Sequence, residues 1–284
     1  MTGHGAGAAL HDDRVRLQVT STGALRSITA HGLALLLYPA TELEDGLAGL
    51  WLRVRGEDGH TPLPLVGTGS GPAPCRVGSV KDDGRPAALV RDGVTDGLQW
   101  SWSLTLLDGQ SGWSWEVLVT NRRRDPVDVD LVHAQDLALS SPDVLAASTL
   151  YPSQYLDLTP VDLGRRGTAL AVRQNMPGPT APWALAGCHT SAGRWATDLL
   201  QLTGRGLPEG APWPGLRADL PAERLQHEHA AAVLQTDPVT LDPGQSWRSG
   251  FFVVVLPDHP EATSDADAEV ADAVALPAEP LAHG

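Results

Sequence analysis

Hydrophobic and polar residues alternate most clearly in residues 100–121. In residues 100–106 tryptophan and leucine alternate with serine and threonine, and in residues 113–120 tryptophan and valine alternate mainly with polar residues. Successive side chains of a strand point to opposite faces, so each arm carries its large residues on one face. The turn residues 108–112, which include two glycines, lie between the arms and predict a β-hairpin.

One face of this hairpin carries four indoles, those of Trp100, Trp102, Trp113 and Trp115. Burying four indoles would contribute at most roughly 15–25 kcal/mol, from about 150–250 Å² each. Such an apolar face needs a broad opposing layer, which indicates a sheet packed on another sheet. Core packing is therefore the preferred interpretation of the indoles, and a platform for stacking sugar rings is the alternative.

Shorter alternating or apolar stretches predict further strands at residues 15–19, 50–54, 127–131, 168–172, 184–187 and 251–256. Residues 50–54 are bulky on both faces, which suggests a strand between two layers. Residues 251–256 are entirely apolar, as expected of a strand buried on both faces. Residues 225–234 fit a strand or a helix, with neighbouring turn signals favouring the strand, and residues 197–202 suggest one helical turn.

Together with 30 Gly and 23 Pro, these stretches predict an all-β fold, a large two-layer antiparallel sandwich with a short C-terminal linker or helix. We expect a disordered N-terminus over 1–14, one sandwich domain over 15–256, and an acidic Ala/Pro-rich linker or tail over 257–284. Residues 265–275 of that tail could form a helix against a partner.

The net charge of -14 argues against nucleic acid and anionic membranes as partners. The chain contains two cysteines, Cys75 and Cys188, which lie far apart in the sequence. We therefore expect reduced thiols and a cytoplasmic location. Residues 1–15 show no secretory signal, and no apolar run is long enough to span a membrane.

The sequence contains no nucleotide loop, nucleophile elbow or paired-cysteine motif. On a strand, His227 and His229 would share a face and could bind a metal ion, but no third ligand is evident, so a surface or hydrogen-bonded role is preferred and no metal is expected. Asp136 and Asp157 could do glycosidic acid–base work if they were spaced across a sugar, although a structural role at a strand end is the simpler interpretation.

Two polar segments have the chemistry of sugar recognition, because they place planar amides and a guanidinium beside an aromatic ring. The candidates for carbohydrate binding or for a domain interface are Gln154, Tyr155, Arg173, Gln174 and Asn175, together with His133 and Asp136. The same groups would serve equally to lock long loops to each other.

Several stretches resemble glycoside hydrolase family 94 phosphorylases, and the likeness is greatest to the 1,2-β-oligoglucan phosphorylase branch. They are residues 36–53, 133–136, 151–157, 173–175, 226–228, 234–235 and 242–244, in the same order. The matches are short, but together they cover most of residues 15–256.

The resemblance implies the N-terminal β-supersandwich of that family, which is related to galactose mutarotases. In the family an (α/α)6 barrel follows, and this barrel carries the catalytic acid and binds phosphate. The resemblance therefore implies no catalytic residue and no cofactor in this chain, with inorganic phosphate used by the barrel. It also implies a partner barrel in the same or an adjacent polypeptide, a possible β-glucan ligand and a possible homodimer.

Two other classes stay open, and with them the question of whether the chain alone is an enzyme. A free-standing aldose epimerase would need a general acid and a general base. Its candidates are His133, His189, His227, Asp136 and Glu228. A stand-alone carbohydrate-binding module would need only a sugar-binding surface.

Overall fold

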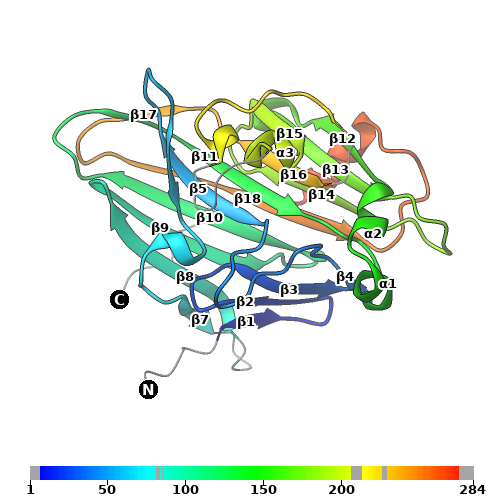
Figure 1. Cartoon of the computed structure of the whole chain (residues 1–284). Helices are drawn as coiled ribbons and strands as arrows, with labels where there is room; N and C mark the ends of the chain where they lie inside the picture. The colour runs from blue at the N-terminus through cyan, green and yellow to red at the C-terminus, as the bar shows by residue number, and fades with distance from the viewer. Residues whose placement is uncertain (1–6, 81–83, 85, 206–212, 226–228, 275–284) are drawn as a thin grey trace.

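The computed structural model describes residues 7–80, 84, 86–205, 213–225 and 229–274. Within these ranges the chain forms three antiparallel sheets, with short helices between some of the strands (Figure 1). The all-β antiparallel fold expected from the alternation is confirmed. None of the helices in these ranges is long and apolar enough to cross a membrane.

The largest sheet has the strand order β12 (Leu156–Asp162), β13 (Thr168–Gln174), β14 (Trp183–Cys188), β18 (Ser246–Leu256), β10 (Gly112–Asn121), β9 (Leu98–Leu106), β8 (Pro86–Thr95) and β7 (Arg76–Val80). The six-stranded sheet has the order β15 (Arg194–Asp198), β16 (Ala230–Gln235), β11 (Val127–Asp136), β5 (Gly49–Val54) and β6 (Thr61–Pro64), with β17 (Val239–Leu241) paired to β11. The smallest sheet has the order β1 (Ala9–His11), β2 (Val15–Val19), β3 (Leu25–Ala30) and β4 (Leu33–Ala34).

The helices are short. They are α1 (Pro142–Ala147), α2 (Leu150–Gln154), α3 (Leu200–Thr203) and α4 (Glu269–Asp272), with 3-10 turns η1 (Thr68–Ser70), η2 (Gly164–Arg166), η3 (Pro214–Leu216) and η4 (Asp265–Ala268). Ser141 caps α1 by accepting a hydrogen bond from the backbone N–H of Val144. The predicted helical turn at 197–202 corresponds to α3, and the ambiguous stretch 225–234 contains β16.

The predicted hairpin is formed by β9 and β10, with Val117 opposite Trp102 in the register. All four of its indoles are at most 2% exposed. The Trp102 and Trp115 rings pack edge to face, with centroids 5.0 Å apart. Core packing is thus confirmed, and no indole of the hairpin can serve as a sugar platform.

The central core lies where the three sheets face one another. Leu50 and Leu52 of β5 point into it from the six-stranded sheet, and Phe251 of β18 points into it from the eight-stranded sheet. Residues 250–255 of β18 are buried without interruption, as the apolar stretch predicted. The core therefore accounts for the fully apolar strands as well as the alternating ones.

The outer face of the six-stranded sheet is also covered, which explains why β5 is bulky on both faces. Trp51 and Arg53 of β5 point outward, away from the central core. Leu202 of α3 and Leu216 of η3 pack over this face in a second apolar cluster. The strand therefore lies between layers, as its sequence suggested.

Both ends of the chain are more ordered than expected. Residues 9–11 do not belong to a disordered N-terminus, because they form β1 beside β2 and Leu10 is fully buried. Residues 257–274 are not a free linker, since Ala271 and Val274 pack against the outer face of the eight-stranded sheet. The helix expected within 265–275 forms as η4 and α4, and it lies against this chain itself.

Candidate functional site

His133 and Asp136 lie inside the sandwich and not on an exposed site. The His133 ring stacks on Phe251 with centroids 5.0 Å apart, and burial lowers its pKa to about 3. The Asp136 carboxylate accepts hydrogen bonds from the backbone N–H groups of Leu37 and Tyr38, at 2.9 and 2.8 Å. Burial raises the pKa of Asp136 to about 6. Both residues are therefore held by contacts inside the sandwich.

Arg173 and Gln174 hold neighbouring segments of the chain in place. The buried Gln174 amide donates hydrogen bonds to the backbone oxygens of Ala138 and Pro152, at 3.0 and 3.1 Å. The Arg173 guanidinium donates to the backbone oxygens of His259 and Pro260. These contacts agree with the loop-locking alternative for the polar segments.

The remaining candidates of those segments are accessible at one end of the sandwich. Gln154 and Asn175 are exposed, and Tyr155 is half-buried at the end of α2. The Tyr155 ring packs edge to face against Tyr151, which is 47% exposed. The Asn175 backbone N–H donates to the backbone oxygen of Tyr155, which joins the two segments. This polar and aromatic surface, residues 150–155 with Asn175, is called the α2 surface below.

The other acid and imidazole candidates are dispersed. His189 is buried, its Nε2 atom is 2.7 Å from the Ser114 hydroxyl, and burial together with the charge of Arg166 lowers its pKa to about 4. Asp157 forms an ion pair with Arg224. His227 and Glu228 lie outside the described residues. Among the residues that are described, no group of three or more metal-ligating side chains occurs.

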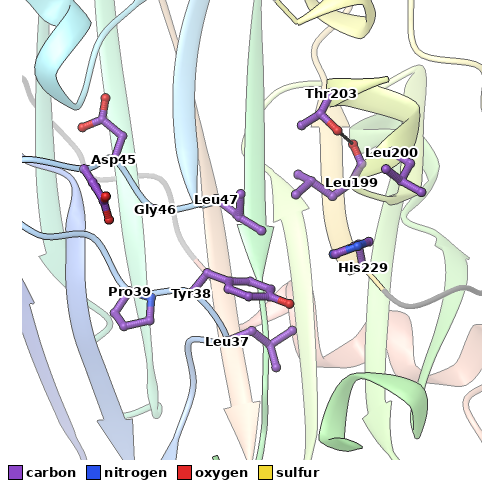
Figure 2. A pocket seen from close by; sticks show the side chains of 11 residues that line it. Leu37, Tyr38, Pro39, Asp45, Gly46, Leu47, Leu199, Leu200, Thr203 and His229 are labelled. Carbon is purple, nitrogen blue, oxygen red and sulfur yellow. Dashed lines mark hydrogen bonds between the residues drawn. The ribbon is translucent and has the colours of Figure 1, made fainter. Parts of the chain in front are cut away.

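Two cavities lie beside the loop 39–49, on the side of the six-stranded sheet that faces away from the core. The smaller, about 550 Å³, is lined by Tyr38, Glu44, Leu199 and His229 among others. Figure 2 shows the Tyr38 ring extending toward His229, whose ring centroid lies 6.4 Å away. Because loop 39–49, α3 and His229, which directly precedes β16, form its walls, residues distant in sequence meet here.

The larger cavity, about 680 Å³, lies on the other side of Asp45 and Gly46, which line both cavities. Its walls include the half-buried Trp51 and Trp213, with ring centroids 5.4 Å apart. Both volumes fall in the range that is usual for small-molecule sites.

Asp45 fixes the loop between the cavities. Its carboxylate accepts hydrogen bonds from the Thr68 backbone N–H, at 2.8 Å, and from the Thr68 hydroxyl, at 2.9 Å. The carboxylate of Glu42 binds the backbone and side chain of Ser21 in the same way. Glu42 and Asp45 thus have structural partners, whereas Glu44 lines the smaller cavity.

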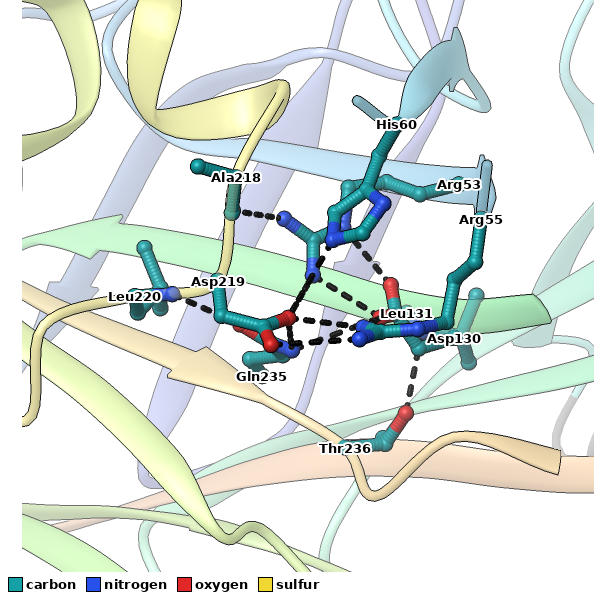
Figure 3. A network of polar contacts seen from close by, with 10 residues as sticks. All are labelled: Arg53, Arg55, His60, Asp130, Leu131, Ala218, Asp219, Leu220, Gln235 and Thr236. Carbon is teal, nitrogen blue, oxygen red and sulfur yellow. Dashed lines mark hydrogen bonds and ion pairs between the residues drawn. The ribbon is translucent and has the colours of Figure 1, made fainter. Parts of the chain in front are cut away.

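A network of charged groups anchors the segment that forms one wall of the larger cavity (Figure 3). The buried Arg53 and Asp130 form a two-pronged ion pair across β5 and β11, at 2.7 and 2.8 Å. Arg55 joins Asp130 to Asp219, which also contacts Gln235 and His60. The guanidinium of Arg55 holds the pKa of Asp219 well below its usual range. The network therefore fixes residues 217–220 to the sheet.

Of the residues that line these cavities, His229 was considered from the sequence, as a possible metal ligand together with His227. Tyr38, Trp51, His60, Trp213 and Arg217 were not among the sequence candidates. One signal was available, because Trp51 alternates with Leu50 and Leu52 and must point away from the core. The other residues are brought together by loop 39–49 and by the segments around α3 and η3, which cover the outer face of the six-stranded sheet. The sequence did not indicate the paths of these segments.

The chain is similar to several proteins of known structure. The chain is similar to a polysaccharide lyase, with a TM-score of 0.50 at 11% identity, over 92% of this chain and 34% of the lyase. It is also similar to a galactose mutarotase related enzyme from Lactobacillus acidophilus (TM-score 0.44, 8% identity, 91% of this chain and 100% of the other). A third is a protein assigned as a kojibiose phosphorylase from the human microbiome (TM-score 0.42, 10% identity, 87% of this chain and 29% of the other).

The chain spans about a third of the length of the lyase, and identities this low speak for the fold alone. No curated protein matches it. The model of the SOGP N-terminal domain family matches residues 18–253, which is most of the chain. The chain therefore belongs to the SOGP N-terminal domain family.

Proposed function

We propose that this chain is a non-catalytic, carbohydrate-associated sandwich domain of a β-glucan phosphorylase of the 1,2-β-oligoglucan or cellobiose type. It would support an (α/α)6 catalytic domain, to which substrate and inorganic phosphate bind, and contribute to dimer contacts. The observation that carries the proposal is the burial of His133 and Asp136 in structural contacts. His133, Asp136 and Asp157, from the resembling stretches 133–136 and 151–157, are thus engaged in contacts within the fold.

The α2 surface is the part of the molecule that we assign to the catalytic domain. Leu150 and Tyr151 are 43% and 47% exposed, and Gln154 and Asn175 surround them with amide groups. Tyrosine is enriched at the energetic centres of interfaces, where a polar rim surrounds an apolar contact. Arg173 and Gln174 would support this surface from behind, since they hold the segments that carry it.

The test combines the chain with the (α/α)6 domain of a 1,2-β-oligoglucan phosphorylase and measures glucose 1-phosphate released from β-1,2-glucan oligomers in phosphate buffer. We expect no release by the chain alone and release by the combination. Tyr151→Ser with Gln154→Ala should weaken association at least tenfold, because the variant removes the central aromatic contact and a rim amide. Association is measured by analytical ultracentrifugation.

The control is Val94→Ser, a substitution at a 69% exposed position of β8, which is separated from β12 by five strands. It should leave association unchanged. Glucose 1-phosphate formation by the isolated chain would refute the proposal. If the α2-surface variant associates as tightly as the wild type, the α2 surface does not contact the catalytic domain.

The smaller cavity favours one alternative, a stand-alone aldose epimerase. Its walls include Glu44 and His229, a carboxylate and an imidazole of the kind that ring opening of a sugar requires. A polarimetric assay of α-glucose mutarotation by the isolated chain separates the alternatives. The epimerase predicts a rate above the spontaneous one that His229→Ala abolishes, whereas the supporting domain predicts the spontaneous rate.

A further inference from the structure

Burial divides the nine tryptophans of the chain into two groups. Five are completely enclosed, namely Trp100, Trp102, Trp113, Trp115 and Trp183. Of the four half-buried ones, Trp195 and Trp247 pack against the edge of the central core, whereas Trp51 and Trp213 line the larger cavity. Trp51 and Trp213 are therefore the indoles that a ligand in this cavity can contact.

The position of the Trp51 ring is fixed from two sides. The ring lies over Gly49, two residues earlier on the same face of β5, so closely that a Cβ atom on Gly49 would be 2.1 Å from it. On its other side the ring meets Trp213, at an interplanar angle of 55°. A ring held in this way needs little reordering on binding, which favours affinity.

The cavity combines this aromatic wall with a few polar groups. Pro62 and Pro64 of β6 add rigid apolar surface, and Thr61 and Arg217 are exposed polar residues beside it. Within the described part of the chain, the Arg217 guanidinium has no hydrogen bond or ion pair, so its donors are available. An aromatic wall with a few convergent donors is typical of sites for small ligands with one apolar face and a polar edge.

A pyranose ring has this chemistry, because its axial C–H groups form an apolar face and its equatorial hydroxyls form a polar edge. We propose that the larger cavity binds a glucose unit of an oligosaccharide, with the ring against Trp51 and Trp213 and its hydroxyls accepting hydrogen bonds from Arg217. The inference rests on the proposed function only for the choice of glucose. The site would hold a glucan chain on the supporting domain.

The experiment titrates the full 284-residue chain with β-1,2- and β-1,4-linked glucose disaccharides, followed by calorimetry and tryptophan fluorescence. We expect saturable binding of at least one disaccharide. Trp51→Ala and Trp213→Ala should each weaken it at least tenfold, and Arg217→Ala several-fold. Gly49→Ala should also weaken it, because the new methyl group displaces the Trp51 ring without removing it.

Trp247→Ala is the matched control, since it removes a half-buried indole outside the cavity and should leave the dissociation constant unchanged. Circular dichroism verifies that each variant is folded, and Arg217→Ala, at an exposed position, remains informative if a tryptophan variant unfolds. Absence of disaccharide binding at millimolar concentration, or binding unaffected by the cavity variants, would overturn the inference. Binding of a phenyl compound without disaccharide binding would overturn it too. Association with the catalytic domain is measured separately, so either proposal can fail alone.

Discussion

Two buried imidazoles and one buried carboxyl titrate in opposite senses in this sandwich. Burial lowers the pKa of His133 to about 3 and of His189 to about 4, from the ordinary value of 6.5. It raises the pKa of Asp136 to about 6, from 3.8. Below pH 6.5 the unfolded chain binds a proton at each imidazole that the folded protein does not bind, which destabilises the fold. Between pH 6 and 4 the folded protein binds the extra proton at Asp136, which stabilises the fold.

We predict that the free energy of unfolding falls by about 1.4 kcal/mol per pH unit as the pH is lowered from 6 to 4. Each of the three groups contributes about 1.4 kcal/mol per pH unit, and the two imidazoles lower the stability while Asp136 raises it. His133→Leu should make this interval nearly flat. Asp136→Asn should roughly double the slope, since both imidazoles are then unopposed. Urea unfolding at pH 6, 5 and 4 measures all three proteins. If His133→Leu keeps the wild-type slope, His133 is not the neutral buried imidazole described here.

These residues also show what the sequence could not indicate at the residue scale. His133 and Asp136 lie in a polar stretch, 133–136, that resembles part of a sugar-active family, yet their neighbours are Phe251 and the backbone of residues 37–38. Those neighbours come from distant parts of the chain. Burial of a polar residue therefore depends on contacts that the local pattern does not contain.

At the scale of elements, alternation predicted the strands better than it predicted what covers them. The hairpin β9–β10 and the double-faced β5 follow from the spacing of large residues, because one face of a strand must be buried. The cover of the six-stranded sheet, by contrast, consists of short turns such as α3 and η3 within a long excursion. Its position depends on the network around Asp130 and Asp219. Since this network joins four separate segments of the chain, no local sequence pattern predicts it.

We predict that Asp219→Ala loosens the cover and leaves the sheet beneath it intact. The substitution removes one of two carboxylate acceptors from each of Arg55 and Gln235, which keep their bonds to Asp130, and the buried Arg53–Asp130 pair remains. Because Asp219 is partly exposed, the local cost should be about 1 kcal/mol, which corresponds to about fivefold faster exchange. Hydrogen exchange followed by mass spectrometry should show this in residues 214–220 and not in β11. Asp58→Ala, at an exposed position in the turn between β5 and β6, is the control and should change exchange neither in residues 214–220 nor in β11.

At the scale of the whole molecule, the C-terminal segment is part of the packed structure. Residues 257–274 cross the outer face of the eight-stranded sheet, where His259 stacks on Trp183 with ring centroids 5.0 Å apart. Arg166 donates hydrogen bonds to the backbone oxygens of Ala271 and Val274, at 2.9 and 3.0 Å. The composition predicted a linker or tail because Asp, Glu, Ala and Pro dominate it and it contains no aromatic residue. The segment is nevertheless held by the apolar contacts of Ala271 and Val274, by the stacking of His259 on Trp183, and by hydrogen bonds from Arg166 and Arg173.

Arg166→Ala should therefore release this segment while the sandwich stays folded. Hydrogen bonds from a charged donor contribute about 1.5–3 kcal/mol each when buried, and the partial exposure of Arg166 lowers the sum for this pair to about 1.4 kcal/mol, which corresponds to a factor of ten. Limited proteolysis should cut within residues 257–274 about tenfold faster in the variant, because cleavage follows the population of the opened form. Arg165→Ala, at the exposed neighbouring position, should be cut at the wild-type rate. Release would also uncover Phe252 and Trp183, so binding of a hydrophobic dye should rise in Arg166→Ala alone. If proteolysis and dye binding do not change, apolar packing of Ala271 and Val274 is sufficient, and the arginine contacts are dispensable for docking.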